Sequence, residues 1–430
     1  MKGKERVKRM SEQQHRLVIA GSMDEFIALA QTAKKRGYYV IVCDGYPDGP
    51  AKKIADKAYT IDVRDVDAFA EMCKTEHADG IIGSFSDLLF EQITKIADKA
   101  NLRWYATPDK LNYYREKDRT KALMKELGVH VPKNKKLESD FSDADLAGFE
   151  FPLVIKPVNG YGSKGIYVVH SVDEIREKFE DVVCRSSGVR TSILVEEYSH
   201  GREYNMMSWI VDGKVYPISL ADREKNPQTG DTLPLLNRVV YPAKAIHQIL
   251  DEAREVQQKF ADAVGQKEGA LSMQFFYSEH GVEVCEIAGR LFGYEHELVT
   301  YSCGLSIEEL LLDYVYDPDQ VRRTMQQHDP YFTRRHCEGI YFVGKQDAVI
   351  ADMSKLLELA KDPNVLESMI FYKDGETVDN YGPRSYLTRL YVGADTREEL
   401  DRITQRMFEE IYVPAQDGSQ VDYPFMLERD

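Results

Sequence analysis

The feature that most restricts the fold of this 430-residue chain is a glycine-rich segment with strand-like sequence on both sides. The segment runs from Val154 to Val169, and Gly160, Gly162 and Gly165 spell G-x-G-x-x-G. In a dinucleotide-binding βαβ unit this string joins a strand to a helix and places pyrophosphate at the helix N-terminus. Here a second strand-like run follows, so we expect a hairpin that folds over phosphates and brings backbone N–H groups close to them.

Three side chains in or beside this hairpin suit the same ligand. Ser163 and Lys164 supply a hydroxyl and a charge, and Lys156, on the preceding strand, can direct an ammonium at α- and β-phosphates. From the loop alone, a flexible surface hairpin with an exposed lysine is an equally good interpretation.

The first hundred residues alternate apolar runs with helical spacing. The run Arg16–Ala20 is followed by a helical pattern and then by the run Tyr39–Cys43, and the alternation continues to a helix that ends near Ala100. This order predicts a doubly wound α/β domain with a parallel sheet. Its first turn, at Gly21, lacks G-x-G-x-x-G, which disfavours a dinucleotide site there.

From Phe151 onward the pattern changes to antiparallel hairpins with a long helix predicted at Ile246–Val264. Asp222–Pro227 is interpreted as a solvated polar loop, and His296 as a surface residue at a helix start. We expect a loose tail at 1–14, the α/β domain at 15–112, a first α+β lobe at 113–190, a second at 191–325, and a small α+β lobe at 326–430.

A second hairpin is predicted to carry a metal-binding carboxylate. Two strands joined by the turn at Ser278–Gly281 bring Gln274 and Glu286 near each other. A carboxylate among apolar neighbours is costly to bury without a cation, and Mg²⁺ on nucleotide phosphates supplies one. Arg290, four residues later, suits the charge of a transferring phosphoryl group. An exposed glutamate paired with Arg290 is the alternative interpretation.

Composition excludes several other classes of protein. The net charge is −16, and the sequence shows no basic stripe, so no nucleic-acid partner is expected. No apolar run approaches membrane-spanning length. Six scattered cysteines without a CxxC pair favour free thiols and a cytoplasmic location, and no histidine spacing indicates zinc.

Taken together, the motifs resemble the ATP-grasp superfamily in order and spacing. Glu116-Lys117-Asp118 before Gly128–Pro132 resembles the family's entry motif, and the resemblance makes Lys117 and Lys156 the two lysines that contact ATP phosphates. It implies an N-terminal doubly wound α/β domain and a two-lobed α+β ATP-grasp domain, with the lobes at 113–190 and 191–325 gripping the nucleotide.

The segment Leu194–Tyr204 resembles the family's adenine hinge. By resemblance, Glu196 accepts from the adenine amino group, Tyr198 lies beside the base, and Glu203 binds the ribose hydroxyls. Glu197 belongs to the same nucleotide-binding motif, although strand alternation predicts that it faces solvent.

Glu286 and Arg290 resemble the family's metal and acyl-phosphate motif. Gln274 stands where Asp or Glu is frequent, and Ala288 where Asn is frequent, so the two predicted metal ligands, Gln274 and Glu286, carry less charge than usual. Arg238 matches a position whose basic residue reaches the γ-phosphate or substrate.

The resemblance implies an enzyme that uses ATP with Mg²⁺ or Mn²⁺ to phosphorylate a carboxylate and passes the acyl group to an amine. Its partners are then a small-molecule carboxylate and an amine, with no membrane and no nucleic acid, and a homodimer is left open. Two alternatives stand beside it: a bicarbonate-using carboxylase or carbamoyl-phosphate synthetase-like enzyme, and a nucleotide-binding module without catalysis. Gln274 and Ala288 motivate the last one.

Overall fold

The computed structural model describes residues 14–159, 165–186, 191–226, 236–380, 384 and 386–427. The chain divides into two compact units, Met1–Leu111 with Ile307–Gln326 (unit 1) and Asn112–Ser306 with Gln327–Asp430 (unit 2). The first boundary lies beside the one expected at 112. The tail expected at 1–14 lies outside the described residues except for Gln14.

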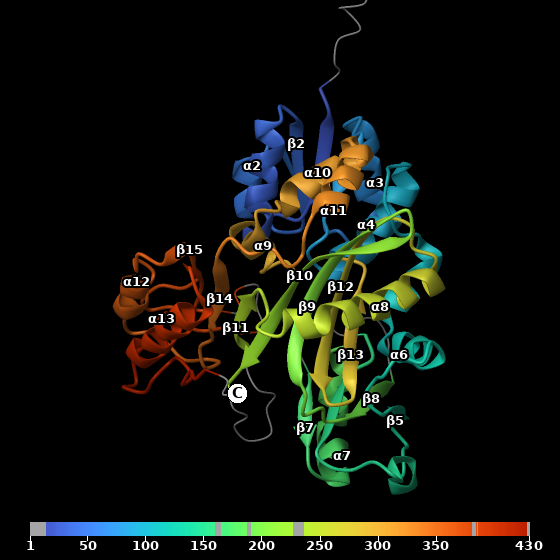
Figure 1. Ribbon diagram of the computed structural model, residues 1–430. Coiled ribbons are helices and arrows are strands. Elements are labelled where there is room, and N and C mark those ends of the chain that lie inside the picture. Colours follow the sequence, from blue (N-terminus) through green and yellow to red (C-terminus); the bar gives the residue numbers. More distant parts are fainter. Residues whose placement is uncertain are drawn as a thin grey trace, which may run out of the picture. The chain divides into compact units, whose positions relative to one another are not determined.

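Unit 1 is built on a four-stranded parallel sheet in the order β3-β2-β1-β4, as the alternating sequence pattern predicts (Figure 1). The central strands are buried because each is a continuous apolar run covered on both faces. The strands are β1 (Arg16–Ala20), β2 (Tyr39–Asp44), β3 (Lys57–Thr60) and β4 (Gly80–Ile82), and the helices are α2 (Ile27–Lys35), α3 (Val66–Thr75), α4 (Asp87–Ala100), α10 (Ile307–Tyr316) and α11 (Pro318–Gln327).

Helix α10 returns to unit 1 from far along the chain. It packs against α2 and β4, and the Arg36 guanidinium lies 2.7 Å from the carboxylate of Asp313. The sequence-based division gave residues 307–325 to the second lobe, because a helix of this kind carries no local sign of the unit it joins. The structure corrects that assignment.

Unit 2 begins with two short helices and an antiparallel four-stranded sheet in the order β5-β8-β6-β7. Helix α7 (Val172–Cys184) covers this sheet with its apolar face, which contributes Ile175, Phe179 and Val182 to a closed core. The other elements are α5 (Asn112–Arg115), α6 (Lys117–Glu126), β5 (Asn134–Glu138), β6 (Leu153–Pro157), β7 (Tyr167–Val169) and β8 (Ser192–Glu197).

The second sheet of unit 2 has eight strands in the order β13-β12-β9-β10-β11-β14-β16-β15. Its strands are β9 (Arg202–Val211), β10 (Lys214–Lys225), β11 (Leu236–Tyr241), β12 (Gly269–Ser278), β13 (Gly281–Ala288), β14 (His336–Phe342), β15 (Val365–Ile370) and β16 (Thr388–Ala394). The long helix α8 (Ile246–Val264) has the predicted bounds and packs along β10, β12 and β13, as Figure 1 shows.

Two expectations about this sheet are wrong. Residues Asp222–Lys225 end strand β10 and are not a polar loop, because all four pair with β11 and Asp222 also pairs with β9. His296 begins helix α9 (His296–Cys303), as predicted, but is fully buried, because α9 packs against β11 and β14.

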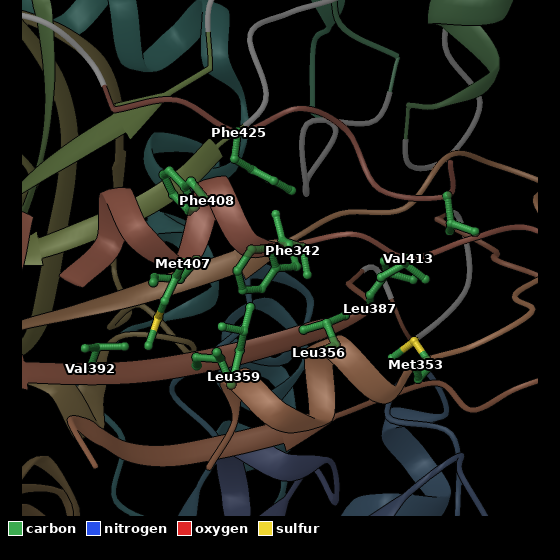
Figure 2. Packing of buried hydrophobic residues seen from close by; sticks show 14 of the residues in the cluster. Phe342, Met353, Leu356, Leu359, Leu387, Val392, Met407, Phe408, Val413 and Phe425 are labelled. Atoms are coloured by element: carbon green, nitrogen blue, oxygen red, sulfur yellow. The ribbon is translucent and has the colours of Figure 1, made fainter. Parts of the chain in front are cut away.

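The C-terminal part of unit 2 has its own apolar core beside the same sheet. Figure 2 shows Phe342 surrounded by side chains from α12 (Ser354–Leu359), β16 and α13 (Arg397–Glu410), among them Leu356, Met407 and Phe408. This α+β part was expected as a separate lobe at 326–430, yet β14, β15 and β16 extend the eight-stranded sheet.

No helix in the part of the chain that the structure describes combines the length and apolar character needed to cross a membrane.

Candidate functional site

Two lysines from different elements share one buried glutamate in unit 2. The Nζ atom of Lys121, on α6, lies 3.0 Å from Oε1 of Glu196, and the Nζ atom of Lys156, on β6, lies 2.8 Å from Oε2. Glu196 lies on β8 opposite Val154 of β6, so Lys156 is its diagonal neighbour on the same face of the sheet. All three residues are at least 96% buried. Two charged amines therefore share a single carboxylate.

Lys117 lies one helical turn before Lys121 and extends this cluster. Its Nζ atom is 3.8 Å from Oε1 of Glu286 on β13, and its backbone N–H donates to the carbonyl oxygen of Val158 at 3.1 Å. The start of α6 is thus tied to the glycine-rich segment, two residues before Gly160. A small cavity beside these groups is lined by Tyr114, Lys117, Thr120, Lys121, Met124, Val284, Cys285, Glu286 and Ile287.

The cluster of Lys117, Lys121, Lys156, Glu196 and Glu286 carries one net positive charge. Burial alone would raise the pKa of Glu196, but Lys121 and Lys156 outweigh it and hold that pKa below 4.5. Burial lowers the pKa of Lys121, whereas Glu196 more than offsets burial at Lys156 and raises its pKa. An excess of buried positive charge suits an anionic ligand such as a phosphate chain.

The predicted metal ligands face each other across two strands. Gln274 on β12 is paired directly with Glu286 on β13, and on its other side with Asn205 on β9, which confirms the predicted hairpin geometry. The amide nitrogen of Gln274 donates to Oε1 of Glu203. This contact occupies the nitrogen and not the amide oxygen, which is the atom that Mg²⁺ prefers.

Glu203, predicted to bind ribose, is held by two basic residues from β10. Its carboxylate lies 2.5 Å from Nε of Arg223 and also pairs with Lys225. Burial would raise the pKa of Glu203, but Lys225 and Arg223 hold it below its ordinary value. Glu203 is therefore ionised and paired with both Arg223 and Lys225.

The other hinge residues lie nearer the surface. Glu197 is half-buried, and its carboxylate lies 3.5 Å from the Lys133 ammonium. The ring of Tyr198 contacts that of His200, with ring centroids 5.1 Å apart. Neither contact joins these side chains to the lysine cluster.

Only the last of the predicted flap positions is described. Gly165 has φ +71°, and a Cβ atom there would lie 2.7 Å from the Arg185 side chain, so the backbone requires glycine. Gly160, Gly162, Ser163 and Lys164 lie outside the described residues.

The two predicted catalytic arginines have different surroundings. Arg290 follows β13, is partly buried, and lies over the ring of Phe292 at 5.4 Å. Arg238, on β11, is buried in an ion network, with its guanidinium nitrogens 2.6–2.7 Å from the carboxylates of Glu224, Glu338 and Asp401. These contacts join Arg238 to β14 and α13 and to none of the other predicted site residues.

Sequence reasoning missed Lys121 and set Arg223 and Lys225 aside as residues of a solvated loop rather than anion-binding groups. Lys121 is four residues after Lys117, a spacing that places both on one helix face. Arg223 and Lys225 alternate on a strand and so share a face, a signal hidden by the interpretation of this segment as a loop.

This arrangement agrees with comparisons to known proteins. Residues 149–296 match the ATP-grasp domain family. The chain contains an ATP-grasp domain. The matched segment includes Lys156, Glu196, Gln274 and Glu286, and the fold has the ATP-grasp architecture.

Similar proteins have several different functions. A formate-dependent phosphoribosylglycinamide formyltransferase of Erythrobacter litoralis is 28% identical over 187 residues, 43% of this chain and 47% of that protein. A carbamoyl-phosphate synthase of Methanobrevibacter smithii is 25% identical over 67% of this chain and 71% of its own. The crystal structure of an L-amino acid ligase from Bacillus licheniformis superposes with a TM-score of 0.78 at 17% identity, covering 94% of this chain and 100% of that one. The chain thus spans about half the length of the first of these relatives, and the structural likeness concerns the fold.

The residues present fit magnesium-bound ATP. The lysine cluster has the charge for a phosphate chain, and Gln274 and Glu286 supply an amide oxygen and a carboxylate on paired strands. Among the described residues, no three His, Cys, Asp or Glu side chains gather as a complete metal site. Mg²⁺ in nucleotide sites is commonly bound by one or two protein groups together with phosphate oxygens, so a two-residue set is sufficient.

Proposed function

We propose that this protein is an ATP- and Mg²⁺-dependent ligase that phosphorylates a carboxylate and transfers the acyl group to an amine. The observation that carries the proposal is the net positive cluster of Lys117, Lys121 and Lys156 around Glu196 and Glu286. An anionic chain that enters this cluster balances its charge, and the bound phosphates lie beside a carboxylate that can hold their metal.

The reaction has two steps. A carboxylate oxygen attacks the γ-phosphorus of ATP, the bond to the β–γ bridging oxygen breaks, and ADP leaves. The amine nitrogen then attacks the acyl carbon, the carbon–oxygen bond to phosphate breaks, and the amine loses a proton. Mg²⁺, when bound, neutralises charge on the phosphate oxygens. Lys117, Lys121 and Lys156 position the phosphates, Gln274 and Glu286 hold the metal, and Arg290 stabilises negative charge on the leaving phosphate.

In this proposal the hinge keeps the roles drawn from the family resemblance, with one change. Tyr198 and Glu197 lie beside the base, and Glu203 reaches the ribose together with its partners Arg223 and Lys225. Glu196 sets the positions and charges of two lysines, a role that its ion pairs support better than an adenine contact. Arg238 is proposed as a structural residue, since three carboxylates surround it.

The nature of the relatives supports a carboxylate substrate. Formate is a carboxylate, and an L-amino acid ligase joins molecules that carry both a carboxylate and an amine. The likeness to a carbamoyl-phosphate synthase makes bicarbonate the second candidate for the phosphorylated acid.

The test is ADP formation from ATP and Mg²⁺ over a matrix of amino acids and small acids, with hydroxylamine present to trap an acyl phosphate as a hydroxamate. We expect ADP and hydroxamate with at least one organic acid. ADP formed with bicarbonate alone would select the second candidate, and ATP binding without ADP across the matrix would indicate a non-catalytic module.

Two variants connect the activity to the cluster. Glu286→Gln and Lys156→Ala should each lower ADP formation at least about 100-fold, since each removes charge that the phosphates or their metal contact. Lys156→Ala leaves one lysine for Glu196, so the fold should persist. Lys136→Ala, at an exposed position on β5, is the matched control. Retained activity in either site variant would remove that residue from the mechanism.

A further inference from the structure

A buried arginine on the eight-stranded sheet, Arg389, has no hydrogen-bond acceptor for its terminal nitrogens among the described residues. Arg389, on β16, has an exposed fraction of 0%. Its Nε atom lies 2.9 Å from the sulfur of Met369, whereas Nη1 and Nη2 have no hydrogen-bond partner among the described residues. A buried charged group with unsatisfied donors costs folding free energy, so its retention calls for a function.

The immediate surroundings of this guanidinium are aromatic. It lies 4.4 Å from the ring centroid of Tyr294, 5.4 Å from that of Tyr391 and 5.9 Å from that of Phe371. Ring faces stabilise a cation, but they do not accept its in-plane N–H groups. The two N–H-bearing ends of the guanidinium therefore remain available to a planar acceptor.

Nearby oxygens have other partners. The hydroxyls of Tyr341 and Tyr391 lie 3.0 and 2.9 Å from the carbonyl oxygen of Tyr294, and the Tyr391 hydroxyl also lies 3.0 Å from Glu297. Glu297 lies 3.2 Å from Nε2 of His296. Burial would lower the pKa of Arg389, but Tyr391 and Glu297 hold it above its ordinary value, so the guanidinium is charged.

Arg389 lies on the same sheet face as the predicted site. Strand pairing and alternation place Tyr341 and Arg389 on the face that carries Asn205 and Gln274. The segment after β13 connects the predicted site to Arg389, because Tyr294, whose ring lies over Arg389, is only four residues from Arg290. Four residues span at most about 14 Å, which is comparable with a molecule of dipeptide size.

Glu295 lies in the same segment and contacts two central strands of the sheet, β9 and β11. Its carboxylate accepts hydrogen bonds of 2.7 Å from both Asn205 and Tyr241. Burial, only partly offset by Tyr241 and Arg223, raises the pKa of Glu295. The face between Arg290 and Arg389 is thus polar and buried, as a small-molecule substrate requires.

We propose that Arg389 binds a carboxylate carried by the amine substrate, so that this substrate is an amino acid or a similar amine with its own acid group. The inference rests on the proposed function. Two parallel N–H groups of a guanidinium match a carboxylate in bidentate geometry. A monoanionic carboxylate can accept both terminal N–H groups, whereas a phosphate dianion would meet more repulsion from Glu297.

The ring of Tyr294 lies over the guanidinium, and Tyr294 is 38% exposed, so the aromatic cover of Arg389 reaches the surface at this residue. The proposal requires this ring to turn aside when the substrate binds. The aromatic walls suit an apolar or aromatic amino-acid side chain.

The first test compares acceptors that differ only in the acid group. The ADP assay is run with two series of amines. One series is L-phenylalanine, L-phenylalaninamide and phenethylamine, and the other is L-alanine and L-alaninamide. We expect the amino acids to have kcat/KM values about 10- to 100-fold above their amides, the range for a charged hydrogen-bonded pair. In Arg389→Met this preference should collapse, and in Arg389→Lys it should fall in part, mainly through KM.

The matched control is Arg384→Met. Arg384 also lies over a ring, Tyr372, at 4.2 Å, but it pairs with Glu376 at 3.0 Å. It should keep the wild-type preference. If Arg389→Met keeps that preference too, or if wild type prefers no amino acid over its amide, the proposal is overturned.

The second test needs no turnover and separates this inference from the proposed function. Calorimetric titration with L-phenylalanine and L-phenylalaninamide should show tighter binding of the acid in wild type and equal binding in Arg389→Met. If that difference appears while no acid supports ADP formation, the ligase proposal fails and the Arg389 site stands. If ADP forms but binding is insensitive to the acid group, the ligase stands and the Arg389 site fails.

Discussion

Three buried cationic groups of unit 2 differ in how many carboxylates accompany them. Arg238 on β11 contacts three, Lys121 and Lys156 share one, and Arg389 on β16 has no carboxylate partner among the described residues. All four side chains are at least 96% buried. The number of carboxylates in contact therefore distinguishes Arg238, a structural residue, from the lysine pair and Arg389, whose positive charge is proposed to attract a ligand.

This difference follows from the cost of burying charge. A buried ion whose partners are complete is expensive to disrupt, because removal of one member leaves the others uncompensated. Arg389 forms no ion pair that its removal would break, and its terminal nitrogens have no hydrogen-bond partner among the described residues, so its removal should cost less than that of Arg238. Stability measurements on the free protein can thus rank the three groups without any substrate.

The largest effect is expected from Arg238→Met. The substitution removes the cation that Glu338 contacts and one of the two that Glu224 and Asp401 contact, the other being Arg397. The free energy of unfolding should fall by about 3–5 kcal/mol. Urea denaturation followed by circular dichroism measures it. A loss below about 1 kcal/mol would show that the network is not structural and would reopen a substrate role for Arg238.

Glu196→Gln should have the next largest effect. Lys121 and Lys156 then lose the carboxylate that both contact, and the free energy of unfolding should fall by about 2–3 kcal/mol, since a lysine can escape part of the cost by releasing its proton. The same denaturation series measures it, with half-exposed Glu197→Gln as the matched control, expected within about 0.5 kcal/mol of wild type. Equal losses in the two variants would contradict the shared-anion interpretation.

The contribution of Glu196 should also depend on pH. Its pKa in the folded state lies below the ordinary 4.5, so the unfolded chain takes up the proton first. The stability that Glu196 provides is complete above about pH 4.5 and is lost as pH falls through its folded-state pKa. Denaturation of wild type and Glu196→Gln from pH 7 down to pH 4 should show the difference in stability shrinking. A difference that widens on acidification would mean that Glu196 is buried in its neutral form.

Arg389→Met should have the smallest effect on stability. Arg389 has no ion pair to break among the described residues, so the free energy of unfolding should fall by at most about 1 kcal/mol, through the lost ring contacts. The denaturation midpoint, measured without ligands, gives the answer. A loss as large as that of Arg238→Met would make Arg389 a packing residue and would remove the contrast between the two arginines.

The local pattern of the sequence predicted the four strands of unit 1 with the helices between them, the bounds of α8 and the pairing of Gln274 with Glu286. Each of these depends on periodicity within a few residues or on one hairpin. The burial of Lys121 could not be predicted, because a lysine on a polar-looking helix is ordinarily solvated, and here β8 and β13 enclose it. The lack of a hydrogen-bond acceptor at the Arg389 terminal nitrogens could not be predicted either, because it depends on every strand and helix that packs around the side chain. The ligand roles of the predicted site residues remain predictions.

The return of α10 and α11 to the N-terminal unit has a consequence for how this protein is made. Unit 1 lacks two of its helices, and Arg36 lacks Asp313, until the ribosome has synthesised residue 326. By then β9 to β13 of unit 2 have already emerged. Translation therefore completes the first unit only after much of the second is available to fold, and a fragment that stops at residue 111 should expose the apolar surface that α10 covers.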